Sequence, residues 1–200
     1  MWYSICAFIR FHCKATNQHG VHSPFVYDFL TEGCYQKSKK LTQFAKNQYR
    51  QGPNDRASSG TYQLLCKISL YWKPRRVLVN SRVCKTLINC IGYHGEGMVL
   101  DSPFEEGFVW PKEHSNPYDL VYFNQLRDRK QSVHLFYTSM GVSHTNTVFF
   151  FSRIRACKKS FATWKDLCAH PKAKVCLDLY NHGIILLREH QEKEYFSLRV

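Results

Sequence analysis

Acidic residues are scarce in this 200-residue chain, which carries 15 Asp and Glu against 28 Lys and Arg, a formal net charge of +13. An excess of this size favours anionic partners such as nucleic acid, an acidic protein or an anionic membrane surface. The cations are spread along the chain rather than gathered in one tract. An ordinary basic surface is therefore the competing interpretation.

Paired cysteine motifs are also missing. The nine cysteines are odd in number and form no CxxC pair. Cys66, Cys90 and Cys176 lie among apolar residues, where a free thiol behaves as a small hydrophobic group. This pattern disfavours a secreted disulfide scaffold, and it predicts a reducing, cytoplasmic location.

No long hydrophobic run is present. The apolar stretch at residues 1–11 is too short to cross a bilayer, and it lacks the basic leader and cleavage site of an export signal. Apolar side chains recur there at helical spacing, and two cations follow them: Trp2, Ile5, Phe8 and Ile9, then Arg10 and Lys14. We expect a helix that docks on the rest of the chain, with a membrane-surface helix as the alternative.

Signatures of common hydrolytic and metal chemistry are absent from the sequence. It contains no GxSxG, P-loop or HExxH motif, which argues against hydrolase classes built on them. His19 and His22, with Cys13 before them, are conceivable metal ligands, but no second group with matching spacing follows. We predict no metal site and expect these side chains to pack at the start of a helix.

Apolar strands alternate with amphipathic helices over most of the chain. Residues 1–57 have helical periodicity and end at a Gly52-Pro53 break, so we predict a helical extension followed by an α/β domain at residues 58–200. Strands are expected at residues 76–80, 98–101, 119–124, 147–151, 174–179, 183–188 and 195–200. Residues 180–182 are expected to form a hairpin-like connection between the strands at 174–179 and 183–188. This order predicts a mainly parallel sheet that ends in an antiparallel hairpin, with ligands bound beyond the carboxyl ends of the strands.

The segment from Val77 to Asp101 has the layout of a nucleotide-cofactor pocket: strand, tight loop, helix and strand, ending on a carboxylate. Its loop, Ser81-Arg82-Val83-Cys84-Lys85, contains no glycine and carries two cations. Glycine lets the backbone approach a ligand closely, and bulky side chains block that approach. The loop therefore has the position of a cofactor loop without its composition.

The segment ATNQHGVHSPFVYDFLTEGCY resembles the N-terminal signature of a bacterial family of class I S-adenosylmethionine-dependent methyltransferases. The resemblance continues through SSGTYQLLCKISLYWKPRRVLV, YDLVYF, TVFFF and WKDLCAHPKAKVCLDLYNHGIILLREHQEKEYFSLRV, and so covers both ends and most of the middle. It implies a seven-stranded Rossmann-like sheet whose last two strands form an antiparallel hairpin at residues 183–200. It also implies an S-adenosylmethionine site at the carboxyl ends of the first strands.

The sequence departs from the family pattern at the first strand. The family has an acidic residue and a glycine-rich turn there, whereas this chain has Asn80 and Ser81 followed by the cations Arg82 and Lys85. S-adenosylmethionine carries a sulfonium and an ammonium, so nearby cations oppose its binding. Asp101 matches the family carboxylate that holds the ribose hydroxyls; the alternative is a turn residue before Ser102-Pro103.

Later strands depart from the pattern as well. Asn124 and the pair Ser152-Arg153 stand where related O-methyltransferases collect carboxylates around a divalent cation, so we predict no catalytic magnesium. The 17 residues at 102–118 are too few for a helix, a strand and their turns. We therefore expect the third strand of the family sheet to be reduced or absent.

Together these features predict a methyltransferase-like protein whose catalytic activity is degenerate or lost. Its vestigial cofactor-binding positions are Asp101, Asn80, Ser81 and Asn124, and S-adenosylmethionine is the only cofactor implied. Two alternatives stay open. One is an active methyltransferase with a rearranged S-adenosylmethionine pocket, and the other is a basic, non-enzymatic module that binds RNA or another polyanion.

Overall fold

The computed structural model describes residues 2–52, 57–80, 83–95, 97–111, 116–126 and 128–200. The chain forms two compact units. The first comprises Met1–Thr16, Arg76–Ser81 and Leu100–Arg199, and the second comprises Asn17–Arg75 and Arg82–Val99 with Val200. The expected division into residues 1–57 and 58–200 stays a prediction.

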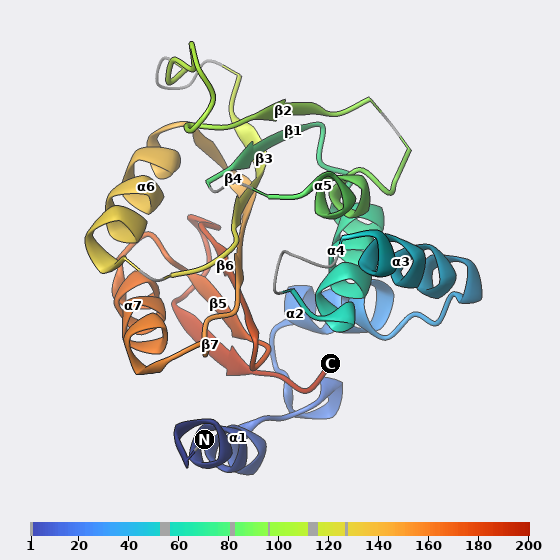
Figure 1. Cartoon of the computed structure of the whole chain (residues 1–200). Coiled ribbons are helices and arrows are strands. Elements are labelled where there is room, and N and C mark those ends of the chain that lie inside the picture. Colours follow the sequence, from blue (N-terminus) through green and yellow to red (C-terminus); the bar gives the residue numbers. More distant parts are fainter. Residues whose placement is uncertain (1, 53–56, 81–82, 96, 112–115, 127) are drawn as a thin grey trace. The chain divides into compact units, whose positions relative to one another are not determined.

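A seven-stranded sheet is the main element of the fold (Figure 1). Its strand order is β2-β1-β3-β4-β6-β5-β7. The strands are β1 Arg76–Val79, β2 Val99–Asp101, β3 Tyr118–Phe123, β4 Ser143–Ser152, β5 Val175–Asp178, β6 His182–Leu186 and β7 Glu194–Ser197. The pairs β1–β3, β3–β4 and β5–β7 are parallel, and β6 runs antiparallel to both of its neighbours, β4 and β5. The predicted α/β sheet, mainly parallel with antiparallel strands near the C-terminus, is confirmed.

The antiparallel hairpin lies earlier in the chain than the family resemblance implies. It is formed by β5 and β6, which pair from Val175 with Leu186 to Asp178 with Gly183. The hairpin-like connection expected at residues 180–182 is confirmed. The hairpin that the resemblance places at residues 183–200 was wrong, because both edges of β6 are already occupied by β4 and β5. The last strand, β7, therefore joins the free edge of β5, where it runs parallel.

The family's third strand is missing from the part of the chain that the structure describes. No strand forms in the described residues between Asp101 and Tyr118, and β2 is an edge strand of the sheet. This confirms the expectation of a reduced third strand, which followed from the 17-residue length of the segment.

Two helices cover one face of the sheet in the first unit, α6 (Arg129–Gly141) and α7 (Lys158–Ala169) (Figure 1). Phe136 of α6 and Trp164 of α7 are fully buried against sheet residues such as Phe149 and Phe151. Burial of each such aromatic side chain contributes on the order of 2 kcal/mol to folding. Gly183 lies directly beneath Trp164, and a Cβ at that position would overlap the indole ring.

The N-terminal helix α1 (Trp2–Lys14) belongs to the same unit as the sheet. Its C-terminal end is fixed by backbone hydrogen bonds: Thr16 N donates to Ser197 O (2.9 Å), and Arg199 N donates to Thr16 O (2.9 Å). Phe11 is buried, whereas the apolar residues Ile5, Phe8 and Ile9 are 53%, 49% and 55% exposed. The helix therefore docks as expected, but through a different face.

The second unit is helical. Its elements are η1 Gln18–Gly20, α2 Pro24–Asp28, η2 Phe29–Cys34, α3 Lys39–Gln51, α4 Ser59–Trp72 and α5 Lys85–Ile91. Ser58 begins α4 with a capping box, in which its hydroxyl accepts a hydrogen bond from Thr61 N (3.3 Å). A side-chain hydrogen bond from Asn89 Nδ2 to Gln48 Oε1 (2.9 Å) joins α5 to α3. Within the described ranges, no helix has the length and apolar character needed to cross a membrane.

Candidate functional site

The predicted cofactor positions follow the carboxyl ends of neighbouring strands in the first unit. Asn80 comes directly after β1, Asp101 ends β2 and Asn124 comes directly after β3. Ser81 lies outside the described residues. The strand order places β2, β1 and β3 side by side, so the backbone brings these three positions to adjacent strands.

Asn80 is turned toward α6 and is only 5% exposed. Its side-chain Nδ2 donates to Ser139 Oγ (3.1 Å), and its backbone N donates to Tyr122 O (2.8 Å). Its Oδ1 is buried, with no hydrogen-bond partner among the residues that the structure describes. An amide at this position is therefore used to join the sheet to a helix.

Asn124 points to the opposite face of the sheet from Asn80. Side chains alternate along a strand, and Leu78 belongs to the core cluster under α6 and α7, so Asn80 shares that face. Tyr122 lies outside that cluster, and its hydroxyl donates a hydrogen bond to Asn124 Oδ1 (3.3 Å), so Asn124 and Tyr122 share the other face. The two amide side chains do not converge on a common ligand position.

The carboxylate of Asp101 is engaged by two residues of the sheet. Its Oδ2 accepts hydrogen bonds from Arg76 Nε (3.2 Å), Arg76 Nη2 (2.9 Å) and the Tyr118 hydroxyl (2.7 Å). Arg76 and Tyr118 are the first residues of β1 and β3, and so belong to the ends of these strands opposite to Asn80. The Arg76 guanidinium also stacks over the Tyr118 ring, 4.6 Å from its centroid.

This arrangement changes what Asp101 can bind. Three donors converge on one carboxylate oxygen, and the Arg76 guanidinium neutralises the charge, which leaves Oδ1 alone for any further donor. Burial, followed by the hydrogen bond and charge of Asp101, raises the pKa of the Tyr118 hydroxyl, so it remains a neutral donor at physiological pH. A ribose diol held by both carboxylate oxygens does not fit a carboxylate in this state.

The carboxyl end of β4 presents a buried hydroxyl and a neighbouring imidazole. Ser152 is fully buried, and its Oγ has no hydrogen-bond partner in the described part of the chain. His182, the first residue of β6, is paired with Ser152 across the strands. Burial lowers the pKa of His182 to about 4, so its imidazole is neutral at pH 7.

The loop before α5 contains a small polar cluster in the second unit. The Cys84 thiol lies 2.9 Å from Thr86 Oγ1, and the Tyr62 hydroxyl lies 3.2 Å from the same oxygen. A Cβ at Gly52 would overlap Thr86, which explains a glycine there. Arg82, one of the two loop cations, lies outside the described residues. Across the described ranges, no group of three or more His, Cys, Asp and Glu residues is arranged to hold a metal ion.

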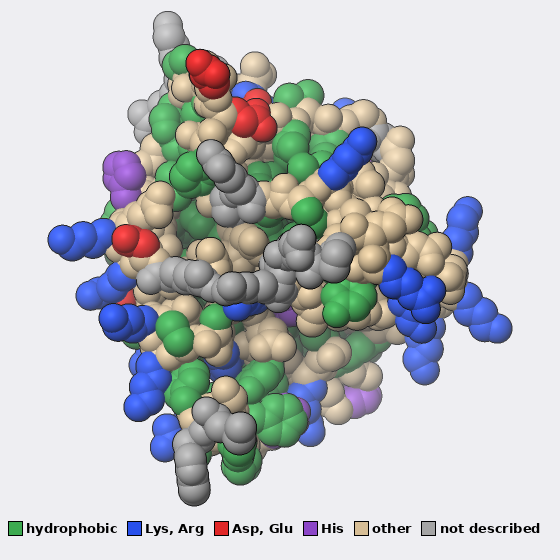
Figure 2. Space-filling view, viewed as in Figure 1, with side chains coloured by type: hydrophobic (Ala, Val, Ile, Leu, Met, Phe, Trp, Pro, Cys, Tyr) green, Lys and Arg blue, Asp and Glu red, His purple; other side chains and the backbone are tan. Residues whose placement is uncertain are grey.

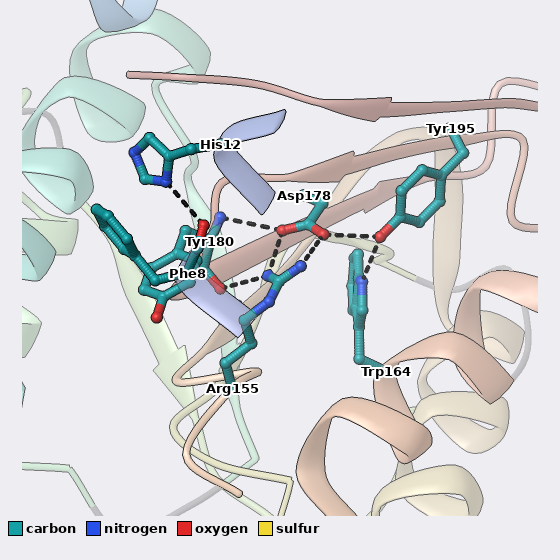
Figure 3. A network of polar contacts seen from close by, with 7 residues as sticks. All are labelled: Phe8, His12, Arg155, Trp164, Asp178, Tyr180 and Tyr195. Atoms are coloured by element: carbon teal, nitrogen blue, oxygen red, sulfur yellow. Dashed lines mark hydrogen bonds and ion pairs between the residues drawn. The ribbon is translucent and has the colours of Figure 1, made fainter. Parts of the chain in front are cut away.

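A network of polar contacts in the first unit lies toward the other edge of the sheet (Figure 3). Asp178, at the end of β5, is 1% exposed and forms a two-pronged ion pair with Arg155. Arg155 Nη1 and Nη2 donate to Asp178 Oδ1 and Oδ2, each at 2.5 Å, and Nη1 also donates to Tyr180 O (2.6 Å).

Two further donors complete the hydrogen bonding of Asp178. Tyr180 N donates to Oδ1 (3.0 Å), and the Tyr195 hydroxyl donates to Oδ2 (2.9 Å) while accepting from Trp164 Nε1 (3.2 Å). Burial is the main reason that the pKa of Tyr195 is raised, so its hydroxyl stays protonated as a donor. Sequence reasoning missed this network, although an isolated Asp in the apolar run VCLDL is a signal, because a buried carboxylate requires a partner.

Comparisons with known proteins show similarity only at the level of structure. No protein-family model and no curated protein matches the sequence. The SAH-bound methyltransferase PaMTH1 of Podospora anserina superposes with a TM-score of 0.51 and 10% sequence identity, over 82% of this chain and 94% of that chain. Cofactor-bound Rv0187 from MTB superposes with a TM-score of 0.50 and 14% identity, over 85% of this chain and 100% of that chain. The chain therefore has a methyltransferase-like fold.

Proposed function

We propose that this protein retains a methyltransferase fold but has lost S-adenosylmethionine-dependent catalysis. The observation that carries the proposal is the engagement of Asp101 by Arg76 and Tyr118, with three hydrogen bonds on Oδ2. This residue is the one acidic position of the family pattern that the sequence keeps, and its charge is already neutralised within the sheet.

The other predicted positions support the same proposal. Asn80 replaces the acidic residue at the end of the first strand, and its amide is directed to Ser139. Asn124 contacts Tyr122 on the other face of the sheet. These residues offer no anionic group to the sulfonium and ammonium of S-adenosylmethionine. When bound by a methyltransferase, that cofactor supplies the transferable methyl group.

Calorimetric titration of the purified protein with S-adenosylmethionine tests this proposal. We expect no saturable heat for the wild-type protein and none for the Asp101→Asn variant. A micromolar dissociation constant for the wild type, lost in Asp101→Asn, would instead support an active enzyme with a rearranged pocket. Thermal unfolding of both proteins without ligand provides the control for folding.

A second candidate function is the binding of a polyanion such as RNA, and a feature of α3 favours it. The helix contains no Asp or Glu, and three of its four exposed cations, Lys39, Lys46 and Arg50, recur at helical spacing. Figure 2 shows Lys and Arg side chains gathered over this helix. A row of cations on one helix face is suited to neutralising successive phosphates.

Filter binding of single-stranded RNA across a salt series tests the second candidate. We expect the affinity to fall as salt rises, and the slope to decrease in the Lys39→Gln/Lys46→Gln/Arg50→Gln variant. The matched control is Lys158→Gln/Lys159→Gln/Lys172→Gln, which removes the same charge from the other unit. Equal effects of both variants would show that net charge alone is responsible.

A further inference from the structure

A cavity of about 630 Å³ lies between α1 and α7 in the first unit. Pockets of roughly 300–1,000 Å³ are typical of small-molecule sites. Its base includes side chains of β5 and β7, at the edge of the sheet opposite to β1 and β2. It is therefore separate from the predicted cofactor positions.

One stripe of each helix lines the cavity. The stripe of α1 has helical spacing throughout and consists of Tyr3, Cys6, Ala7, Arg10, Phe11 and Lys14. The stripe of α7 consists of Phe161, Lys165, Cys168 and Ala169. A helix rises 1.5 Å per residue, so the stripe of α1 is about 16 Å long. The cavity is therefore elongated along α1 and suits an extended ligand.

The walls combine apolar surface with uncompensated positive charge. Ala7, Phe11, Phe161 and Ala169 give it an apolar body. Its charged lining residues are four cations and one anion, and the anion, Asp178, is paired with Arg155. This leaves 4 − 1 = 3 positive charges.

These three charges are carried by Arg10, Lys14 and Lys165. All three side chains are exposed, and no ion pair with a carboxylate is formed by them in the described part of the chain. Arg10 and Lys14 lie one turn apart on the same helix face, where like charges repel each other. A bound anion would relieve this repulsion.

The Arg155–Asp178 pair closes the base of the cavity without adding charge (Figure 3). The Arg155 guanidinium packs over the rings of Phe11 and Phe161, with centroid distances of 5.1 and 4.1 Å. Its hydrogen bonds to Asp178 and Tyr180 leave it committed to the protein. The hydroxyl of Tyr3, in the wall of the cavity, is buried and has no hydrogen-bond partner among the described residues.

We infer that this cavity binds a single-chain anionic amphiphile of the fatty-acid class. The hydrocarbon chain occupies the apolar space between α1 and α7, and the carboxylate lies among Arg10, Lys14 and Lys165. An apolar chain gains free energy from leaving water, and the cations select the sign of the head group.

Peptide-resolved alkylation offers an internal control for this inference, because α1 carries two cysteines. Cys6 lines the cavity, whereas Cys13 is exposed and is not part of its lining. Dodecanoate, used below its micelle concentration, should slow the reaction of Cys6 with iodoacetamide and leave Cys13 unchanged. Dodecyltrimethylammonium, with the same chain but opposite charge, and butyrate, with the same head group but a short chain, should protect neither.

Charge variants provide the second arm of the test. Lys14→Gln/Lys165→Gln should weaken calorimetric dodecanoate binding by roughly tenfold, because the variant removes two of the three cations that attract the carboxylate. Lys158→Gln/Lys159→Gln, a matched pair on α7 outside the lining, should leave the affinity within about twofold. Absence of Cys6 protection by dodecanoate, equal protection by the cationic amphiphile, or equal losses in the two variants would overturn the inference.

Discussion

Replacement of Arg155 by Met probes the buried ion pair that supports the β5–β7 edge of the sheet. The side chains of Arg155 and Asp178 are 7% and 1% exposed, so water screens their interaction little. Arg155→Met removes two hydrogen bonds to Asp178 and one to Tyr180 O. Among the described residues, Tyr180 N and the Tyr195 hydroxyl then remain as donors to the Asp178 carboxylate, which becomes a buried, uncompensated charge.

The expected cost of this change is about 3–5 kcal/mol in the free energy of unfolding. For a chain of this size, each kcal/mol corresponds to roughly 2–4 °C in Tm, so the midpoint should fall by about 6–20 °C. Urea and thermal unfolding followed by circular dichroism measure both quantities. Asp178→Asn in the same background should recover part of the loss, because it removes the unpaired charge.

Arg129→Met is the matched control for Arg155→Met. Arg129 Nε donates to Asp166 Oδ2 at 2.7 Å, but these side chains are 69% and 41% exposed. Removing an exposed pair should cost less than about 1 kcal/mol. If Arg155→Met were no more destabilising than Arg129→Met, the buried ion pair would contribute no more to stability than an exposed one, contrary to our expectation.

Three further predictions concern a histidine, a glycine and a cysteine. Burial lowers the pKa of His182 from 6.5 to about 4, so the imidazole binds a proton in the unfolded chain at a higher pH than in the folded protein. Urea titrations should therefore show that the wild-type protein loses about 3 kcal/mol of unfolding free energy between pH 7 and pH 4, a loss that His182→Gln does not share. Gly183→Ala should destabilise by about 1–3 kcal/mol because its methyl group meets the Trp164 ring, whereas Gly141→Ala, with open space around it, should have little effect; thermal melts compare the two. Hydrogen bonds from Ser160 lower the pKa of the exposed Cys157, so Cys157 should be alkylated faster than Cys13 at pH 7. If the ratio of the Cys157 rate to the Cys13 rate were unchanged in Ser160→Ala, the hydrogen bonds from Ser160 would not be the cause.

The strands were predictable from sequence because they are continuous apolar runs. The runs at residues 76–80 and 119–124 were each placed within one residue of β1 and β3. The reduction of the third strand followed from the family resemblance and from the short span between Asp101 and Asp119. Hydrophobic periodicity indicates where a strand or helix lies, because that pattern is contained in the local sequence.

The partners of charged side chains could not be predicted in the same way. Arg76 was expected only as the first residue of a strand, yet its guanidinium determines the state of Asp101, 25 residues later. Arg155 and Asp178 are 23 residues apart and meet only because β4 and β5 flank β6. Such contacts depend on the register of the sheet, which local sequence does not encode.

The orientation of α1 was also beyond the sequence. Ile5, Phe8 and Ile9 form the more hydrophobic stripe, but the helix docks through Phe11 and faces the cavity with Tyr3 and Ala7. Hydrogen bonds between Thr16 and the backbone at the end of β7 fix the end of the helix, so its docked face is set by this attachment as well as by hydrophobicity.

A crystal structure grown with saturating S-adenosylhomocysteine tests the proposed loss of cofactor binding most directly. We expect no adenosyl density beyond the carboxyl ends of β1 and β2, with Asp101 Oδ2 still bound to Arg76 and Tyr118. Density for a ribose whose two hydroxyls donate to Asp101, with Arg76 displaced from the carboxylate, would contradict it.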